Sequence, residues 1–122
     1  MESSPKKTVL IVEDSDVIRT LLGRILSQRG FTIAEASGGQ EALVLLKKQK
    51  IDFIISDLDM PTGDGASFLG SLKQEKNTIP VLICTGYTDA TLDNYASYGI
   101  KALVHKPIDM QVVDQILSFL QS

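Results

Sequence analysis

The hydrophobic residues of this 122-residue chain fall into short apolar runs that alternate with segments of helical periodicity. Five runs of branched and aliphatic residues are too short for helices and are bounded by turn residues, so they predict buried strands. We place these strands at residues 8–12, 31–36, 51–55, 81–84 and 102–104. The intervening periodicity predicts helices at residues 17–28, 40–49, 66–76, 89–97 and from residue 108 or 109 onwards.

Two of these elements are weaker than the others. The run at 31–36, FTIAEA, alternates apolar and polar residues, which favours a strand near the edge of a sheet. The helix at 89–97 contains Thr91, Asn94 and Ser97, which are indifferent helix formers, and it has few apolar residues to face a core. We therefore expect it to be the most mobile helix.

Strict alternation of strand and helix with short connections predicts an α/β fold with a parallel sheet, helices on both faces and right-handed crossovers. The expected architecture is a doubly wound (βα)5 flavodoxin-like three-layer sandwich with strand order 2-1-3-4-5. The chain shows no internal repeat beyond this alternation and no low-complexity linker. We expect a single domain at residues 8–122, preceded by a polar, disordered lead at residues 1–7.

The composition narrows the functional classes. Hydrophobic residues make up 43% and charged residues 22% of the chain, which is an ordinary globular balance. The net charge of -3 argues against direct binding of nucleic acid, which needs clustered Lys and Arg. No apolar stretch is long enough to span a membrane, and the N-terminus lacks a signal-peptide core, so we expect a cytoplasmic protein without a membrane partner. The single cysteine, Cys84, lies in an apolar run and is expected in the core.

Candidate chemistry gathers where the predicted strands end. Asp57 follows the apolar run at 51–55, and Pro61 and Gly63 then force a loop. In an open parallel sheet, ligands bind in the crevice at the carboxyl ends of the strands. Asp57 is therefore either a carboxylate that caps a turn, a common use of Asp in loops, or a reacting or metal-binding carboxylate.

The first strand ends in two adjacent acids, Glu13 and Asp14, which repel each other. They are either solvated, with Asp14 or Ser15 capping the next helix, or held together by a cation. A hard divalent ion such as Mg²⁺ prefers oxygen ligands and often takes only one or two protein carboxylates.

The fourth and fifth strands end at Thr85 and Lys106. In a doubly wound sheet these two residues would converge with the three acids in one crevice. A divalent cation and a lysine ammonium would offset the repulsion of the acids and leave Asp57 ionised and nucleophilic. Phosphoryl transfer to such a carboxylate needs mainly charge neutralisation and alignment, which a cation, a lysine and a hydroxyl supply.

In these features the sequence resembles the response-regulator receiver domains of two-component signalling. The resemblance covers residues 9–120 and rests on the Glu13-Asp14 pair, Asp57 in DLDMPTGDG, Thr85-Gly86 and Lys106-Pro107. It implies that Asp57 accepts a phosphoryl group from a sensor histidine kinase or a histidine phosphotransfer protein. Phosphorylation would then switch binding of a downstream protein target.

The resemblance also implies roles for the other residues. Mg²⁺ or Mn²⁺ would be held by the carboxylates of Asp14 and Asp57 and the main-chain carbonyl of Asp59, with Glu13 acting largely through water. Thr85 and Lys106 would each contact a phosphoryl oxygen. Pro107 would follow a cis peptide bond.

The chain departs from the family pattern in ways that bear on switching. Leu103 stands three residues before the lysine, where the family usually has Tyr or Phe, so the common coupling of that ring to the threonine is absent. Gly86 leaves the pocket open, which should ease donor access. Asp59 and Tyr87 occupy positions that tune the lifetime of the phosphoryl group. His105 is expected to be a strand residue facing the helices rather than a ligand.

Several alternatives stay open. The chain is either a stand-alone switch, which docks kinases on its first helix and targets on its fourth and fifth helices and fifth strand, or a receiver domain excised from a longer regulator or hybrid kinase. It could also be a receiver-like binding module that is never phosphorylated. A Mg²⁺-dependent phosphohydrolase would use Asp59 as a second acid beside Asp57, but no length remains for a cap domain. A flavin-binding protein of this fold would need a hydroxyl- and glycine-rich phosphate loop after the first strand, which the sequence lacks.

Overall fold

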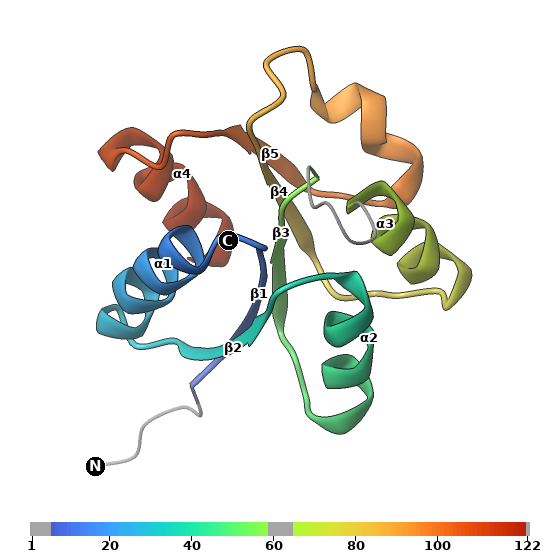
Figure 1. Ribbon diagram of the computed structural model, residues 1–122, viewed down its shortest axis with the longest axis horizontal. Helices are drawn as coiled ribbons and strands as arrows, with labels where there is room; N and C mark the ends of the chain where they lie inside the picture. Colours follow the sequence, from blue (N-terminus) through green and yellow to red (C-terminus); the bar gives the residue numbers. More distant parts are fainter. Residues whose placement is uncertain (1–5, 59–64, 122) are drawn as a thin grey trace.

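A computed structural model of the chain describes residues 6–58 and 65–121. Five parallel strands form one sheet in the order β2-β1-β3-β4-β5, as the sequence predicts. Helices α1 and α4 cover one face of this sheet, and α2, α3 and the short helix η1 cover the other (Figure 1). The three-layer α/β fold expected from the alternation of strands and helices is therefore confirmed.

The elements agree with the predicted ones to within a few residues at their ends. The strands are β1 (Thr8–Val12), β2 (Thr32–Ala36), β3 (Phe53–Ser56), β4 (Val81–Thr85) and β5 (Ala102–His105). The helices are α1 (Asp16–Gln28), α2 (Gly39–Lys48), α3 (Gly65–Gln74), η1 (Leu92–Tyr98) and α4 (Met110–Gln121).

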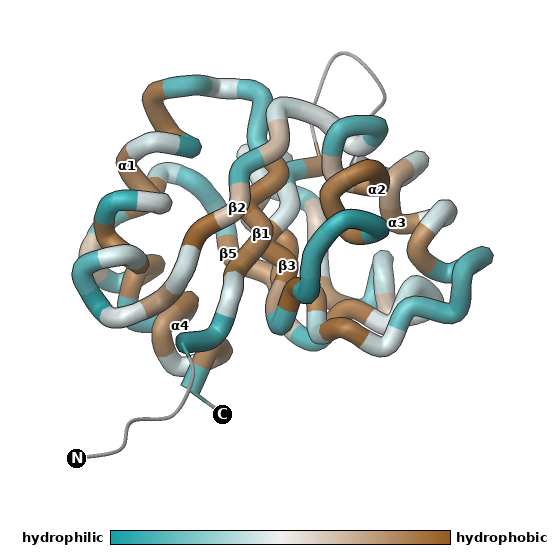
Figure 2. Tube along the Cα trace, turned by 90° about the horizontal axis from the view of Figure 1, so that it is seen from below, coloured by the Kyte–Doolittle hydropathy of each residue, from teal (hydrophilic) through white to brown (hydrophobic). Residues whose placement is uncertain are grey.

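Alternate residues of the buried strands supply two separate hydrophobic cores. On β1, Leu10 and Val12 join a cluster beneath α2, α3 and η1, whereas Val9 and Ile11 join a cluster beneath α1 and α4. Figure 2 shows hydrophobic residues concentrated along the inner strands, with hydrophilic residues on the outer turns of the helices. Cys84 is 3% exposed and belongs to the second cluster, so the expectation of a core cysteine is confirmed.

Polar caps fix the chain at the carboxyl edge of the sheet. The Ser15 hydroxyl accepts a hydrogen bond from the Ile18 amide and caps α1, so Ser15 rather than Asp14 is the capping residue. Asp109 accepts from the Val112 amide at 2.9 Å and caps α4 in the same way. Asp14 is thus left outside the capping arrangement, with its carboxylate exposed beside the end of β1.

The predicted α-helix at 89–97 is wrong in type and in its start. The segment Leu92–Tyr98 is a 3-10 helix without a buried residue, bounded by a capping box between Thr91 and Asn94 and by Gly99 in the left-handed conformation. Thr91 and Asn94 bond to each other within one turn, and Tyr95 and Tyr98 pack against the core while only partly buried, so little buried apolar surface stabilises a longer α-helix.

Two other expectations concern the membrane and the N-terminus. Within the part of the chain that the structure describes, no helix has the length and apolar character needed to cross a membrane. Of the predicted lead at residues 1–7, only Lys6 and Lys7 belong to the described residues, and both are exposed.

Candidate functional site

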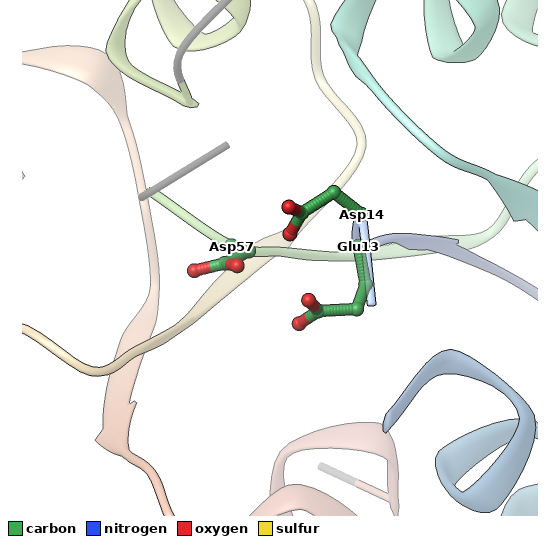
Figure 3. Close-up of side chains that lie close together, drawn as sticks. All are labelled: Glu13, Asp14 and Asp57. Carbon is green, nitrogen blue, oxygen red and sulfur yellow. The ribbon is translucent and has the colours of Figure 1, made fainter. Parts of the chain in front are cut away.

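Three carboxylates meet at the carboxyl edge of the sheet. Glu13 and Asp14 follow β1 and Asp57 follows β3, and one oxygen of each carboxylate lies within 4.8 Å of the other two (Figure 3). The parallel pairing of β1 with β3 brings these strand ends together, and the Asp57 amide donates to the Val12 carbonyl at 3.0 Å. Glu13 and Asp57 are buried, whereas Asp14 is exposed, so the cluster opens to solvent on the Asp14 side.

Lys106 supplies the positive charge at this cluster. Its ammonium lies 2.9 Å from Glu13 Oε1 and 3.0 Å from Asp57 Oδ2. Burial of the ammonium lowers its pKa, but the hydrogen bonds and charges of the two carboxylates outweigh burial and raise the pKa of Lys106 above its ordinary value. Lys106 is therefore fully charged at neutral pH.

The charge balance of the cluster fits a divalent cation. Three carboxylates and one ammonium give these four groups a net charge of -2. All the donor atoms offered are carboxylate oxygens, which are the ligands that Mg²⁺ and Mn²⁺ prefer. Asp59, whose main-chain carbonyl the resemblance implies as a further ligand, lies outside the described residues.

The Thr85 side chain lies at the end of β4 and is fully buried. Its hydroxyl oxygen accepts a hydrogen bond from the Tyr87 amide at 3.0 Å, which leaves the hydroxyl proton available as a donor. The Lys106 amide donates to the Thr85 carbonyl at 2.8 Å, so the ends of β4 and β5 are joined here. Gly86 and Tyr87 are both exposed, and no side chain stands on the first residue after Thr85.

Strand β5 carries the remaining residues that the sequence singles out. Leu103 is half-buried and packs against the hydrophobic cluster beneath η1, where the family usually places an aromatic ring. His105 is exposed, and its Nε2 lies 2.9 Å from the Ala90 carbonyl, outside the carboxylate cluster. Because a carbonyl only accepts, Nε2 carries the proton in this bond. The Lys106–Pro107 peptide bond is cis, as the resemblance implies.

Arg19, a residue of α1 that the sequence analysis did not single out, contacts the site. Its Nη1 donates to the Glu13 carbonyl at 2.6 Å, its Nε to Glu35 on β2 at 3.1 Å, and its Nη2 to Asp16. Arg19 lies one turn after the capping residue Ser15, and helical side chains lean towards the N-terminus of the helix. This lean lets Arg19 reach back to the β1–α1 loop, but the sequence does not show which groups it binds there.

Repulsion within the cluster has a measurable consequence for stability. In protein without divalent cation, we expect Asp14→Asn to raise the free energy of unfolding by about 1 kcal/mol, because it removes one exposed charge near two others. Added Mg²⁺ should stabilise the variant much less than the wild type. Urea unfolding with and without Mg²⁺ measures both effects, with Asp114→Asn on α4 as the control. A variant less stable than wild type in the absence of Mg²⁺ would contradict the repulsion.

Comparison with known proteins agrees with this geometry. The family model of the response regulator receiver domain matches residues 9–118. The sensor kinase CckA of Brucella abortus is 33% identical over 111 residues, which cover 88% of this chain and 12% of the kinase. The structure of the chemotaxis protein CheY4 of Vibrio cholerae superposes with a TM-score of 0.85 at 27% identity, covering 94% of this chain and 98% of that one.

A third relative is the response regulator TrrA of Thermotoga maritima, solved in complex with Mg(2+)-BeF. It has a TM-score of 0.81 at 26% identity and covers 93% of this chain and 98% of that one. The chain spans between 10% and 35% of the length of the curated relatives compared, which include kinases and transcriptional regulators. The match over almost its whole described length shows that the chain belongs to the response regulator receiver domain family.

Proposed function

We propose that this receiver domain is a phosphorylation switch whose phosphoacceptor is Asp57. One observation carries the proposal: the Asp57 carboxylate lies beside Glu13 and Asp14 and accepts a hydrogen bond from the Lys106 ammonium at 3.0 Å. A lysine at this distance can also neutralise a phosphoryl oxygen on Asp57. The buried Thr85 hydroxyl, at the end of the adjacent strand, would donate to a second oxygen.

The transfer forms one bond and breaks one. A carboxylate oxygen of Asp57 attacks the phosphorus of a phosphohistidine, and an O–P bond forms. The P–N bond breaks, its electron pair stays on the imidazole nitrogen, and that nitrogen takes a proton from solvent. The protein mainly aligns the carboxylate and neutralises the charge of the phosphoryl oxygens.

Mg²⁺ or Mn²⁺ would be held by Asp14 and Asp57, with Glu13 nearby and the Asp59 carbonyl as a further ligand. When bound, the ion would offset the negative charge that the carboxylates and the phosphoryl group share. The TrrA relative, solved in complex with Mg(2+)-BeF, supports this assignment. The remaining steps depend on the chain's own groups, above all on Lys106 and Thr85.

The test is the mass of the intact protein after incubation with a small acyl phosphate or amidophosphate, with and without Mg²⁺. We expect one labile phosphoryl adduct that requires Mg²⁺. Hydroxylamine should convert the acyl phosphate into a stable hydroxamate, and tryptic digestion should place it in the peptide that spans residues 51–73. No adduct, under conditions that label a control receiver, would leave the non-phosphorylated binding module as the better account. Steady turnover of a phosphomonoester would instead favour the phosphohydrolase.

We further propose that α1 docks the kinase or phosphotransfer protein. The helix begins at Asp16, two residues after the acidic pair, so a partner seated on it is close to Asp57. Two apolar side chains of α1 face solvent, since Val17 is 77% and Leu21 is 46% exposed. They line a hollow of about 420 Å³ together with Asp16, Thr20 and Arg24. Exposed apolar side chains beside charged ones are typical of protein contacts.

We expect Leu21→Asp to slow phosphotransfer from a protein donor about 10-fold, because it places a charge at the centre of this contact. Labelling by a small phosphodonor and the melting temperature should stay at the wild-type values. The rate is measured with those donors, from a panel of kinases and phosphotransfer proteins, that phosphorylate the wild type. Val44→Asp, which replaces a similarly exposed residue on α2, is the matched control. Equal slowing by both variants would count against docking on α1.

We propose that switching acts through the loop between β4 and η1. Phosphorylation adds charge and acceptor oxygens beside Thr85, whose hydroxyl already holds the Tyr87 amide. At the η1 end of the loop, His105 Nε2 donates a hydrogen bond to the Ala90 carbonyl. Movement of this loop would alter the surface of η1, β5 and α4, where a downstream protein target would bind. Leu103 packs beneath this surface in place of an aromatic ring and would follow the movement through packing alone.

A further inference from the structure

We infer that Arg19 is a positioning residue that holds the main chain at Asp14 in place and thereby raises the affinity of the site for a divalent cation. The inference rests on the proposed metal site and adds a residue that contacts none of the reacting atoms. The carbonyl that Arg19 binds at 2.6 Å belongs to the peptide bond that joins Glu13 to Asp14. A fixed peptide plane at this point fixes the position of the Asp14 Cα, the atom that carries the side chain.

The three carboxylates differ in what restrains them. The Glu13 carboxylate accepts from the Ser15 amide at 3.0 Å and from Lys106 at 2.9 Å, and the Asp57 carboxylate accepts from Lys106. Within residues 6–58 and 65–121, no hydrogen bond or ion pair holds the carboxylate of Asp14, which is exposed. Its position therefore depends on the main chain, which Arg19 holds at the Glu13 carbonyl and the Glu13 carboxylate holds at the Ser15 amide.

Arg19 is itself held from two further directions. Glu35 on β2 accepts from Nε at 3.1 Å, and Asp16 in the first turn of α1 accepts from Nη2. The side chain is only 14% exposed, so its position is well restricted. A guanidinium is planar and presents its donors in a rigid fork, so fixing two of them directs the third at the Glu13 carbonyl. Arg19 thus connects the β1–α1 loop to the edge strand β2 and to α1.

A lysine at the same position would keep the positive charge but lose the planar arrangement of N–H donors. This difference separates a positioning role from a purely electrostatic one. If Arg19 acted only through its charge, Arg19→Lys would behave as the wild type and Arg19→Met would not. If it acts by holding the Glu13–Asp14 peptide, both variants should weaken cation binding, because an ammonium cannot hold the three acceptors in this geometry.

The experiment compares wild type with Arg19→Lys, Arg19→Met and the control Arg29→Met. Arg29 is an exposed residue at the C-terminal end of α1, so its variant makes the same chemical change away from the Glu13 carbonyl. Titration calorimetry with Mg²⁺ alone measures the affinity. Loss of a residue that orients a metal ligand typically weakens binding about 10- to 100-fold, and we expect at least 10-fold for both Arg19 variants. The control should bind as the wild type does.

A second measurement needs no metal. Amide hydrogen exchange of residues 13–16 in the metal-free protein should be faster in both Arg19 variants and unchanged in Arg29→Met. Wild-type affinity together with unchanged exchange in the Arg19 variants would overturn the inference. Faster exchange with unaltered affinity would also overturn the inference, because the restraint of the loop would then have no effect on the affinity for Mg²⁺. A wild type that binds no Mg²⁺ would overturn the proposed metal site and the role of Arg19 in cation affinity. Exchange would then decide separately whether Arg19 restrains the loop.

Discussion

Asp57→Asn should abolish the phosphoryl adduct. The amide has the size of the carboxylate but lacks the charged oxygen that attacks phosphorus, so neither a small phosphodonor nor a protein donor should label the variant. Intact mass after incubation with donor and Mg²⁺ measures the loss, and the expected result is no detectable adduct. The tryptic peptide of residues 51–73 holds four aspartates, so the substitution also identifies which of them reacts.

The control for this result is Asp52→Asn in the same peptide. Asp52 accepts a hydrogen bond from the Thr8 amide at 2.8 Å, at the opposite edge of the sheet from the carboxylate cluster. Asparagine can accept the same bond through its carbonyl oxygen, so this variant should fold and label as the wild type does. Labelling of Asp57→Asn at the wild-type rate would show that another carboxylate is the acceptor.

The boundaries of the strands could be predicted because each strand is a short apolar run between turn residues. Their order followed from the doubly wound topology that the alternation of strands and helices implies. Once the strands are parallel and doubly wound, their carboxyl ends share one edge, so the residues that follow them must lie near one another. Glu13, Asp57 and Lys106 meet in this way, and their contacts needed no information beyond topology. The site is therefore more predictable than the helices around it.

Side-chain contacts between elements were less accessible to the sequence. Arg19 has the spacing of a solvent-facing helical residue, and only the position of the loop and of Glu35 reveals what it binds. The contact of His105 with the Ala90 carbonyl likewise depends on the path of a loop 15 residues away in the chain. The 3-10 form of Leu92–Tyr98 depends on local polar bonds that weak helix propensity alone does not specify.

Lys106→Met should lower the stability of the protein and its rate of phosphorylation without weakening the binding of Mg²⁺. The substitution leaves the buried carboxylates of Glu13 and Asp57 without their shared cation. Breaking a buried ion pair from one side costs about 3–5 kcal/mol. The cluster opens to water beside Asp14, so we expect a smaller loss in the free energy of unfolding, about 1–3 kcal/mol. Urea unfolding in the absence of divalent cations measures this loss.

The same variant should bind Mg²⁺ at least as tightly as the wild type, because removal of the ammonium makes the net charge of the cluster more negative by one. Mg²⁺ should therefore recover part of the lost stability. Labelling by a small phosphodonor should nevertheless fall about 100-fold, the scale of losing one electrostatic contact to the transferred group. Lys101→Met, next to the other end of β5, is the control, since Lys101 is also charged but is exposed and lies away from the carboxylates.

The pH dependence of stability gives an independent check on Lys106. Its pKa is raised in the folded protein, so the stabilisation it provides is fully present below its ordinary pKa of 10.5 and is lost only as the pH rises beyond that value towards the folded pKa. The difference in unfolding free energy between wild type and Lys106→Met should therefore stay constant between about pH 7 and pH 9 and shrink only above the ordinary pKa of lysine. A difference that shrinks within the neutral range would mean that the ammonium is not held by the two carboxylates. Unaltered labelling of Lys106→Met would remove Lys106 from the phosphoryl-transfer step and leave it a structural partner of Glu13 and Asp57.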